Sequence, residues 1–513
     1  MKKLFTLFLC VLSVSAFSQP LIEWQRSFGG TGFDYCHKTV PTSDGGYIAV
    51  GATRSANSGD VGNNQGGSDC WILKLDADGD IEWQRTLGGS DNESALSVWQ
   101  TSDGGYIVGA QTKSDDGDVS GHHGNDDYWI IKLTATGDLE WQRTYGGSAN
   151  EILGSVCQAS DGGYFVCGLT GSNNGDVSDN HGLTDIWVLK LDNTGAIEWQ
   201  KTLGGSDFDY ANQASQTADG GYIISGYTRS IDGDLSFSRG ESDIWIIKLD
   251  EQGEVEWKNT FGGNMTDVST SIKQTSDGGY AVIGFTLSTG GDVTTHHGSA
   301  DIWVLKLDSA GSLEWQRTFG GTQSEIGTSI QLTNDGGFIL IGNSSSSDGQ
   351  VSENQGSLDC WLVRLDALGD IVWQKTFGGS DDDQGFSAVQ ASDGGFIFCA
   401  GVYSNDGDVS GHHGNADFWV VKLSSGITDI ETISTADALH VFPNPASNFI
   451  RVKLDGNTPL ANAQFLDISG KMIAAPAIDS AGNIDVSGLA KGVYLLRVTD
   501  SNGTQYTKEI VKQ

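Results

Sequence analysis

The chain has 513 residues, a formal net charge of −37 at pH 7, 72 glycines and only 6 prolines. So acidic a chain is a poor partner for nucleic acid, because binding a phosphate backbone needs clustered Lys and Arg. Hydrophobic residues make up 37% and charged residues 19%, which excludes a disordered polyelectrolyte and a protein with many membrane spans. The length allows about three domains of roughly 150 residues or one large repetitive domain.

A secretory signal peptide is expected at residues 1–18. Two lysines precede an apolar run at residues 4–17, and the small residues Ala16 and Ser18 suit cleavage before Gln19. The run is too short to span a bilayer. We therefore expect an exported chain with no transmembrane segment.

Residues 19–423 repeat with a period of 58 residues. Each repeat holds an Asp-Gly turn such as SDGG, a phrase such as DIWVLKL and a phrase such as EWQRTFGG. A fixed period of this length indicates a propeller, a solenoid or an array. Of the 15 tryptophans, fourteen belong to the two phrases: Trp71, Trp129, Trp187, Trp245, Trp303, Trp361 and Trp419 to the first, and Trp24, Trp83, Trp141, Trp199, Trp257, Trp315 and Trp373 to the second.

Each repeat contains four runs with the character of strands. The first is short and polar and is followed by the Asp-Gly turn, a favoured hairpin signal. The second and third are apolar on both faces, as in sheets packed between neighbouring sheets. The fourth is the EWQRTF type. We therefore predict an all-β fold in which residues 19–423 form a seven-bladed β-propeller with four antiparallel strands per blade.

The ends of the repeat region predict how the ring closes. The chain begins with a strand of the fourth type at Ile22–Phe28, and the seventh repeat stops at Leu423 without one. The N-terminal strand can therefore complete the last blade and remove an exposed sheet edge. The repeats resemble a tandem family common in exported bacterial proteins. In addition, DADGDIEW at Asp76–Trp83 is similar to the tryptophan-docking turn of quinoprotein-type propellers, which implies that an outer-strand Trp packs between blades.

The C-terminal region is expected to be a second domain. Residues 424–438 form a polar linker, and residues 439–513 read as short strands without the repeat landmarks. VFPNPASN, DISGKMI, LAKGVYLLRV and the ending KEIVKQ resemble the C-terminal sorting domain of the type IX secretion system. The resemblance implies a small Ig-like β-sandwich and recognition by the type IX machinery at the outer membrane of a Gram-negative bacterium, for delivery to the cell surface or the extracellular space. The motif residues are Pro443, Asn444, Pro445, Gly470, Gly492 and Tyr494. The prolines suit an extended approach to the first strand, and the glycines suit turns with unusual backbone angles.

Six cysteines remain after the expected signal peptide, and none forms a CxxC pair, so zinc is not indicated. Cys157 and Cys167 flank one hairpin turn closely enough to form a disulfide in an exported protein. The alternative, which we favour, is that each cysteine replaces a small apolar residue.

An acid stands four residues after the second glycine of each GG. Seven carboxylates at the starts of the innermost strands would form a ring near the mouth of the channel, where like charges repel. The ring could bind an ion or a cationic ligand; the alternative, which we favour, is that each carboxylate accepts backbone N–H bonds that hold neighbouring blades together. The residues are Asp34, Glu93, Glu151, Asp209, Asp267, Glu325 and Asp383.

The long loop after the second strand is a candidate metal site. DGD pairs offer hard oxygens on a flexible turn and suit calcium, although Asp-Gly is also an ordinary turn. The pairs are Asp116 with Asp118, Asp232 with Asp234, and Asp406 with Asp408. The same loops hold histidines that suit a transition metal less well, because no fixed acid accompanies them: His122, His123, His181, His296, His297, His412 and His413.

Catalytic motifs such as GxSxG, HExxH and the Walker loop are absent from the sequence. Near-identical blades also argue against an active site, because an acid and a base need different environments. We therefore expect a non-enzymatic exported propeller that binds or adheres to an unknown extracellular glycan or protein, with calcium as its candidate cofactor. Two alternatives are a surface hydrolase that acts on glycan through rim carboxylates and a structural component of a surface layer.

Overall fold

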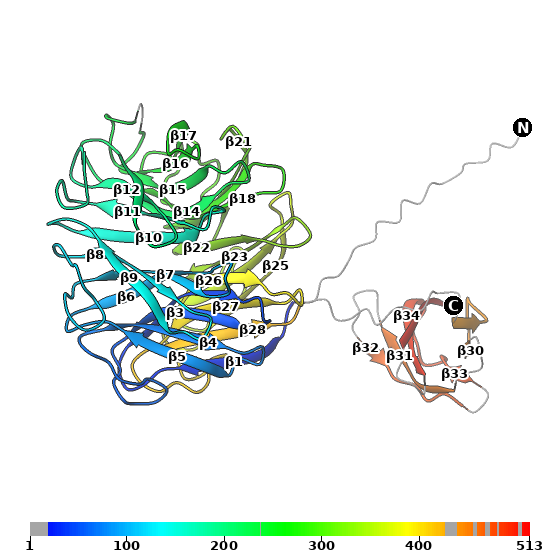
Figure 1. Cartoon of the computed structure of the whole chain (residues 1–513). Coiled ribbons are helices and arrows are strands. Elements are labelled where there is room, and N and C mark those ends of the chain that lie inside the picture. The colour runs from blue at the N-terminus through cyan, green and yellow to red at the C-terminus, as the bar shows by residue number, and fades with distance from the viewer. Residues whose placement is uncertain are drawn as a thin grey trace, which may run out of the picture. The chain divides into compact units, whose positions relative to one another are not determined.

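The computed structural model describes residues 19–235, 238–425, 439–454, 459–466, 472–479, 482–500 and 505–513. All regular elements in these residues are β-strands. The chain divides into two compact units, Met1–Gly426 and Ile427–Gln513, and each is described by itself (Figure 1). The expected signal peptide and residues 426–438 of the expected linker lie outside the described residues.

The first unit contains seven four-stranded antiparallel sheets, which confirms the predicted number of blades. Blades 1 to 3 are β2 (Asp34–Pro41), β3 (Tyr47–Thr53), β4 (Asp69–Leu75) and β5 (Ile81–Leu87); β6 (Glu93–Gln100), β7 (Tyr106–Thr112), β8 (Asp127–Leu133) and β9 (Leu139–Tyr145); β10 (Glu151–Gln158), β11 (Tyr164–Thr170), β12 (Asp185–Leu191) and β13 (Ile197–Leu203). Blades 4 to 6 are β14 (Asp209–Gln216), β15 (Tyr222–Thr228), β16 (Asp243–Leu249) and β17 (Val255–Phe261); β18 (Asp267–Gln274), β19 (Tyr280–Thr286), β20 (Asp301–Leu307) and β21 (Leu313–Phe319); β22 (Glu325–Leu332), β23 (Phe338–Ser344), β24 (Asp359–Leu365) and β25 (Ile371–Phe377). Blade 7 consists of β26 (Asp383–Gln390), β27 (Phe396–Val402), β28 (Asp417–Leu423) and β1 (Ile22–Phe28).

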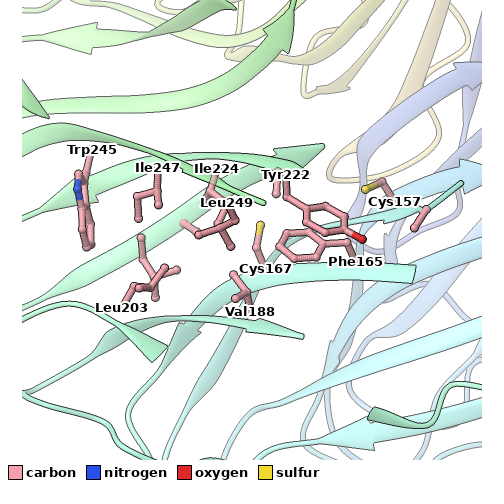
Figure 2. Close-up of a cluster of buried hydrophobic side chains, with 14 of the residues drawn as sticks. Cys157, Phe165, Cys167, Val188, Leu203, Tyr222, Ile224, Trp245, Ile247 and Leu249 are labelled. Atoms are coloured by element: carbon pink, nitrogen blue, oxygen red, sulfur yellow. The ribbon is translucent and has the colours of Figure 1, made fainter. Parts of the chain in front are cut away.

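The first strand of every blade lies innermost. These seven strands contact one another in sequence around a complete ring, from β2 to β6 and onward to β26, which returns to β2. The second and third strands are buried on both faces because each sheet is covered by its two neighbours. Figure 2 shows one such interface, in which Trp245, Ile247 and Leu249 of blade 4 pack against Val188 and Leu203 of blade 3.

The ring closes as predicted, through the N-terminal strand. β1 pairs antiparallel with β28, from Ile22 opposite Leu423 to Phe28 opposite Phe418. The pairing also joins side chains, since Lys422 Nζ lies 2.9 Å from Glu23 Oε2. The last blade therefore has no missing outer strand.

The fourth-strand tryptophans pack on the following blade, as the resemblance implied. Trp24 of blade 7 meets Tyr47 of blade 1 edge-on, with ring centroids 5.8 Å apart, and its Nε1 donates to Ala77 O at 3.1 Å. The same contact recurs at all seven interfaces, with centroid distances of 5.5–6.1 Å. Each blade is thus packed against the fourth-strand tryptophan of the preceding blade.

A buried lysine on the third strand pairs with the aspartate of the SDGG turn in six of the seven blades. Lys74 Nζ lies 3.0 Å from Asp44 Oδ2 of the SDGG turn and 2.9 Å from Glu82 Oε2. In blade 6, Val372 occupies the position of this glutamate. Arg364 there replaces the lysine, and its guanidinium donates to Asp335 and to Phe338 O.

The second unit is a sandwich of two sheets around one apolar cluster, as predicted. One sheet has the order β29 (Leu439–Phe442), β30 (Phe449–Leu454), β33 (Asn483–Asp485), and the other has the order β32 (Met472–Ala474), β31 (Leu460–Leu466), β34 (Gly492–Asp500), β35 (Gln505–Lys512).

The motif residues of this unit have different positions. Pro443 and Pro445 follow cis peptide bonds between β29 and β30. Asn444 Oδ1 accepts the Val511 N–H at 2.8 Å, and Tyr494 donates to Ala490 O at 3.0 Å. Gly492 begins β34 without a left-handed φ, so the unusual backbone angle predicted for it is wrong. Gly470 lies outside the described residues.

The disulfide considered between Cys157 and Cys167 does not form. Both cysteines are free and buried. They are not paired across the hairpin, because Cys157 stands opposite Phe165 and Cys167 stands opposite Ser155.

Candidate functional site

The seven predicted rim carboxylates begin the first strands and are fully buried or nearly so. Each accepts the backbone N–H of the second glycine in the preceding GG, at 2.7–2.8 Å. In blades 1, 2, 3 and 6, the hydroxyl of the last residue of the second strand also donates to the carboxylate, as Thr112 does to Glu93 at 2.8 Å. Asp and Glu both reach these donors, which explains why they interchange. The carboxylates thus hold the connection between one blade and the next.

A second set of seven buried carboxylates begins the third strands. In the sequence these aspartates open the phrases of the DIWVLKL type, and they were not predicted as site residues. Their Oδ2 atoms accept the backbone N–H four residues earlier, at 2.6–2.7 Å. Within the described residues, all seven Oδ1 atoms lack a hydrogen-bond partner. The residues are Asp69, Asp127, Asp185, Asp243, Asp301, Asp359 and Asp417.

The two sets meet at each seam between blades. A Cβ on Gly88 would lie 2.5 Å from Asp69 Oδ1 and 2.7 Å from Glu93 Oε2, so only glycine fits between the carboxylates. Burial, followed by the nearby negative charges of Glu93 and Asp118, raises the pKa of Asp69 to about 6. The seam therefore holds carboxyl groups that burial makes easier to protonate.

The DGD aspartates bind the same connections. In the loop of blade 2, Asp116 Oδ1 accepts the Ser90 N–H at 2.7 Å, and Asp118 Oδ2 accepts the Gly88 N–H at 3.2 Å. Gln65 Nε2 also donates to Asp118, at 2.6 Å. Asp232, Asp234 and Asp406 accept the equivalent backbone N–H groups of Ser206, Gly204 and Ser380. Asp408 Oδ2 instead accepts from Gln355 Nε2, at 2.9 Å.

The expectation that no fixed acid accompanies the loop histidines is wrong, because four of them lie beside a third-strand aspartate. His123, His181, His297 and His413 place Nδ1 2.7–3.2 Å from the Oδ2 atom of the aspartate four residues later. In the part of the chain that the structure describes, no three His, Cys, Asp or Glu side chains are grouped to hold a metal. The calcium site stays a prediction, and the loop residues have a separate hydrogen-bonding role.

The contacts between blades repeat around the ring, whereas the residues that line the central channel differ from blade to blade. A cavity of about 470 Å³ is lined by residues from all seven first strands. At the fifth position of these strands, five blades carry Ser, whereas β2 carries Lys38 and β14 carries Gln213. At the seventh position the residues are Val40, Trp99, Cys157, Ser215, Lys273, Gln331 and Val389. We call this space the lower cavity.

Trp99 is the one tryptophan outside the two repeated series, and 42% of it is exposed. It lines the lower cavity together with Lys38 and Lys273. In the sequence, these residues could be found because each interrupts the repeat in the first strand of its blade. Only the structure shows that they line one cavity.

Two further cavities lie along the first strands. One of about 270 Å³ is lined by His37, Tyr210 and Phe386, among others. Burial lowers the pKa of His37 to about 4, so its imidazole is neutral at pH 7. The other cavity, of about 530 Å³, lies where blades 1 and 2 meet and includes Tyr35 and Arg54.

Comparison with known protein families identifies the second unit. Residues 440–513 match the family described as "Secretion system C-terminal sorting domain". The two-sheet fold and this match mark the unit as a type IX sorting domain, which implies interaction with the secretion machinery. The chain is exported to the cell surface or the extracellular space. The described residues include no helix with the length and apolar character to cross a membrane.

Relatives of the propeller are more distant. The "Regulatory protein FlaEY" of Caulobacter vibrioides is 27% identical over 173 residues, which cover 32% of this chain and 18% of FlaEY. This chain therefore matches less than a fifth of that relative's length. The Pan2 WD40 domain of Neurospora crassa has a TM-score of 0.43 and 9% identity, over 77% of this chain and 95% of that one. The propeller of the Trilobed protease from Pyrococcus furiosus has a TM-score of 0.40 and 9% identity, over 79% and 98%. The propeller fold itself rests on the seven sheets of this chain.

Proposed function

We propose that the exported propeller is a non-enzymatic binding module, used for binding or adhesion outside the cell. The observation that carries this proposal is that the first strands have two kinds of position. Their repeated acids hold the seams, whereas their variable residues line the channel. Variation confined to a concave, partly apolar surface is typical of a ligand site.

Hydrolysis of glycan is the alternative from another class of function. It requires two carboxyl groups, set apart from the rest, on either side of one bond. Among the described residues that line the three channel cavities, the acids are Glu93 and Asp126. Glu93 is buried and holds a seam, and Asp126 lies 3.5 Å from Lys113 Nζ. These engagements favour binding over hydrolysis. A structural role in a surface layer is the third candidate, and it predicts self-assembly of the purified protein.

A glycan array probed with residues 19–513, with and without calcium, tests the proposal. We expect retention of particular glycans without their cleavage. Release of reducing sugar from a retained glycan would instead establish the hydrolase. Assembly into ordered particles with no retained glycan or protein would favour the structural role.

The sorting domain makes a separate prediction about delivery. Truncation at Ser434 removes the second unit but leaves all seven blades intact. We expect a folded propeller that is trapped in the periplasm, measured by cell fractionation and by the melting temperature of the purified product. Normal amounts of truncated protein outside the cell would contradict the assigned role of the domain.

A further inference from the structure

We propose that the lower cavity binds a small organic anion, whose charged group lies between Lys38 and Lys273 and whose planar apolar part lies against Trp99. This inference rests on the proposed binding function and adds the chemical class of ligand. It follows from three observations on the cavity: its charge, its size and its lining.

The charge of the cavity is opposite to that of the protein. The chain carries 66 acidic and 29 basic residues, yet the described residues that line the cavity include two lysines and no acid. This local positive charge favours an anion over a cation in the cavity of an otherwise highly negative protein.

These two half-buried lysines differ from the fully buried lysines of the propeller. Lys74, Lys132, Lys190, Lys248, Lys306 and Lys422 each lie within 3.0 Å of two carboxylates. In the described structure, Lys38 and Lys273 form no ion pair. Burial and the neighbouring charge of Lys38 lower the pKa of Lys273 to about 8. Two ammonium groups that repel one another in a recessed space gain from a shared anion.

The remaining lining suits an apolar body. Val40, Val98, Val156, Ala214 and Val389 contribute aliphatic surface, and Trp99 contributes a half-exposed ring. A volume of about 470 Å³ falls within the range of small-molecule sites, roughly 300–1,000 Å³. An aromatic carboxylate, sulfonate or phosphate matches this combination, whereas a bare inorganic anion would leave the apolar surface unused.

Paired fluorescent probes test the charge and the apolar surface separately. The anionic probe is 8-anilinonaphthalene-1-sulfonate, and the matched neutral probe is N-phenyl-1-naphthylamine, which has the same ring system without the sulfonate. We expect residues 19–513 to bind one sulfonate probe per chain, measured by calorimetry and fluorescence. The neutral probe should bind at least tenfold more weakly.

Variants assign the binding to named residues. Lys38→Gln with Lys273→Gln should weaken sulfonate binding at least tenfold without changing the affinity for the neutral probe. Trp99→Ala should weaken both probes by similar factors. The control is Lys375→Gln, because Lys375 also has no ion pair in the described structure but lies over the Phe377 ring on the outer strand β25, outside the cavity. Lys38→Arg with Lys273→Arg keeps both charges and should retain sulfonate affinity within about threefold, which guards against a folding defect in the glutamine variant.

Equal affinity for the two probes, or full sulfonate affinity in a folded double glutamine variant, would overturn the inference. In that case, glycans retained on the array would leave the general binding function standing. Conversely, glycan cleavage with intact sulfonate binding would overturn the proposed function and not the anion site.

Discussion

The strand β18 carries both kinds of position that distinguish the seams from the channel. Asp267 begins it, is fully buried, and has an acidic counterpart in every other blade. Lys273 stands six residues later, lines the channel, and has no basic counterpart at that position in another blade. The two residues share one strand, but Asp267 holds neighbouring blades together and Lys273 lines the channel.

The difference shows what the repetition achieves. The contact between neighbouring blades recurs seven times with similar residues, because every blade has to fit its neighbour in a closed ring. The channel is lined once by all blades together, so each blade is free to contribute something different. Repetition therefore marks stability in this molecule, and its interruption marks the surface available for recognition.

Removing the closing strand is the most severe way to break the seams. Deletion of residues 19–28 removes β1, the Glu23–Lys422 ion pair and the Trp24–Tyr47 contact. We expect a loss of stability greater than the roughly 3–5 kcal/mol of one buried Trp→Ala change, measured by urea unfolding. An unchanged melting temperature would contradict the role of this strand in closure.

Two substitutions within β18 sharpen the comparison. Asp267→Ala removes the acceptor of the Gly263 N–H and of the Ser288 hydroxyl, both buried. We expect a loss of about 3 kcal/mol, because hydrogen bonds to a charged group are lost and their donors stay buried. Lys273→Gln should leave the unfolding free energy nearly unchanged. If Lys273→Gln were the more destabilising change, the division between seam and channel positions would fail.

The pH dependence of stability separates two groups of acids. Burial first of all raises the pKa of Asp69, Asp209 and Asp359 to about 6. A carboxyl group whose pKa is raised in the folded state stabilises the fold when it is protonated. This stabilisation is fully present below the unfolded-state pKa of about 4 and is lost as the pH rises through about 6. The SDGG acids behave in the opposite way: burial opposes ionisation of Asp44 and Asp103, but hydrogen bonds and Lys74 or Lys132 lower each pKa to about 2. Their stabilisation is lost as pH falls through about 2.

We therefore expect the melting temperature to rise as pH falls from 7.5 to about 5, and to fall in strong acid. Calorimetry across this range checks both limbs. A melting temperature that falls steadily from pH 7.5 to 5 would show that the pKa values of the seam carboxyl groups are not raised by folding.

Calcium is expected to have the smallest effect. Millimolar calcium should raise the melting temperature slightly more than sodium at equal ionic strength, and Asp116→Asn, Asp232→Asn and Asp406→Asn together should remove the difference. The amide retains an acceptor for the backbone bond, as Asn174 does for the Ser148 N–H at 2.8 Å in blade 3. The triple variant thus tests the cation and not the turn. Equal effects of the two salts would leave the loops as an acidic surface without a metal.

Much of the fold could be predicted because the tryptophan phrases and Asp-Gly turns repeat. They gave the number of blades, and the offset of Ile22–Phe28 gave the closure. The partners of buried polar groups could not be predicted in the same way. Asp44 and Lys74 are far apart in sequence, and their pairing depends on the twist and spacing of strands. Likewise, Lys38, Trp99 and Lys273 come from three blades, and no local pattern indicates that they line one space.

Closure through β1 also sets an order of events in folding. The Glu23–Lys422 pair spans 399 residues, whereas the first six blades pair strands that follow one another in the chain. Local hairpins form quickly, and a contact between distant residues waits for the chain between them. Among the described strands β1 comes first in the chain, and we expect it to be the last to find its sheet. Until then it is an unpaired edge, and its charged residues Glu23 and Arg26 are of the kind that discourages association with another chain.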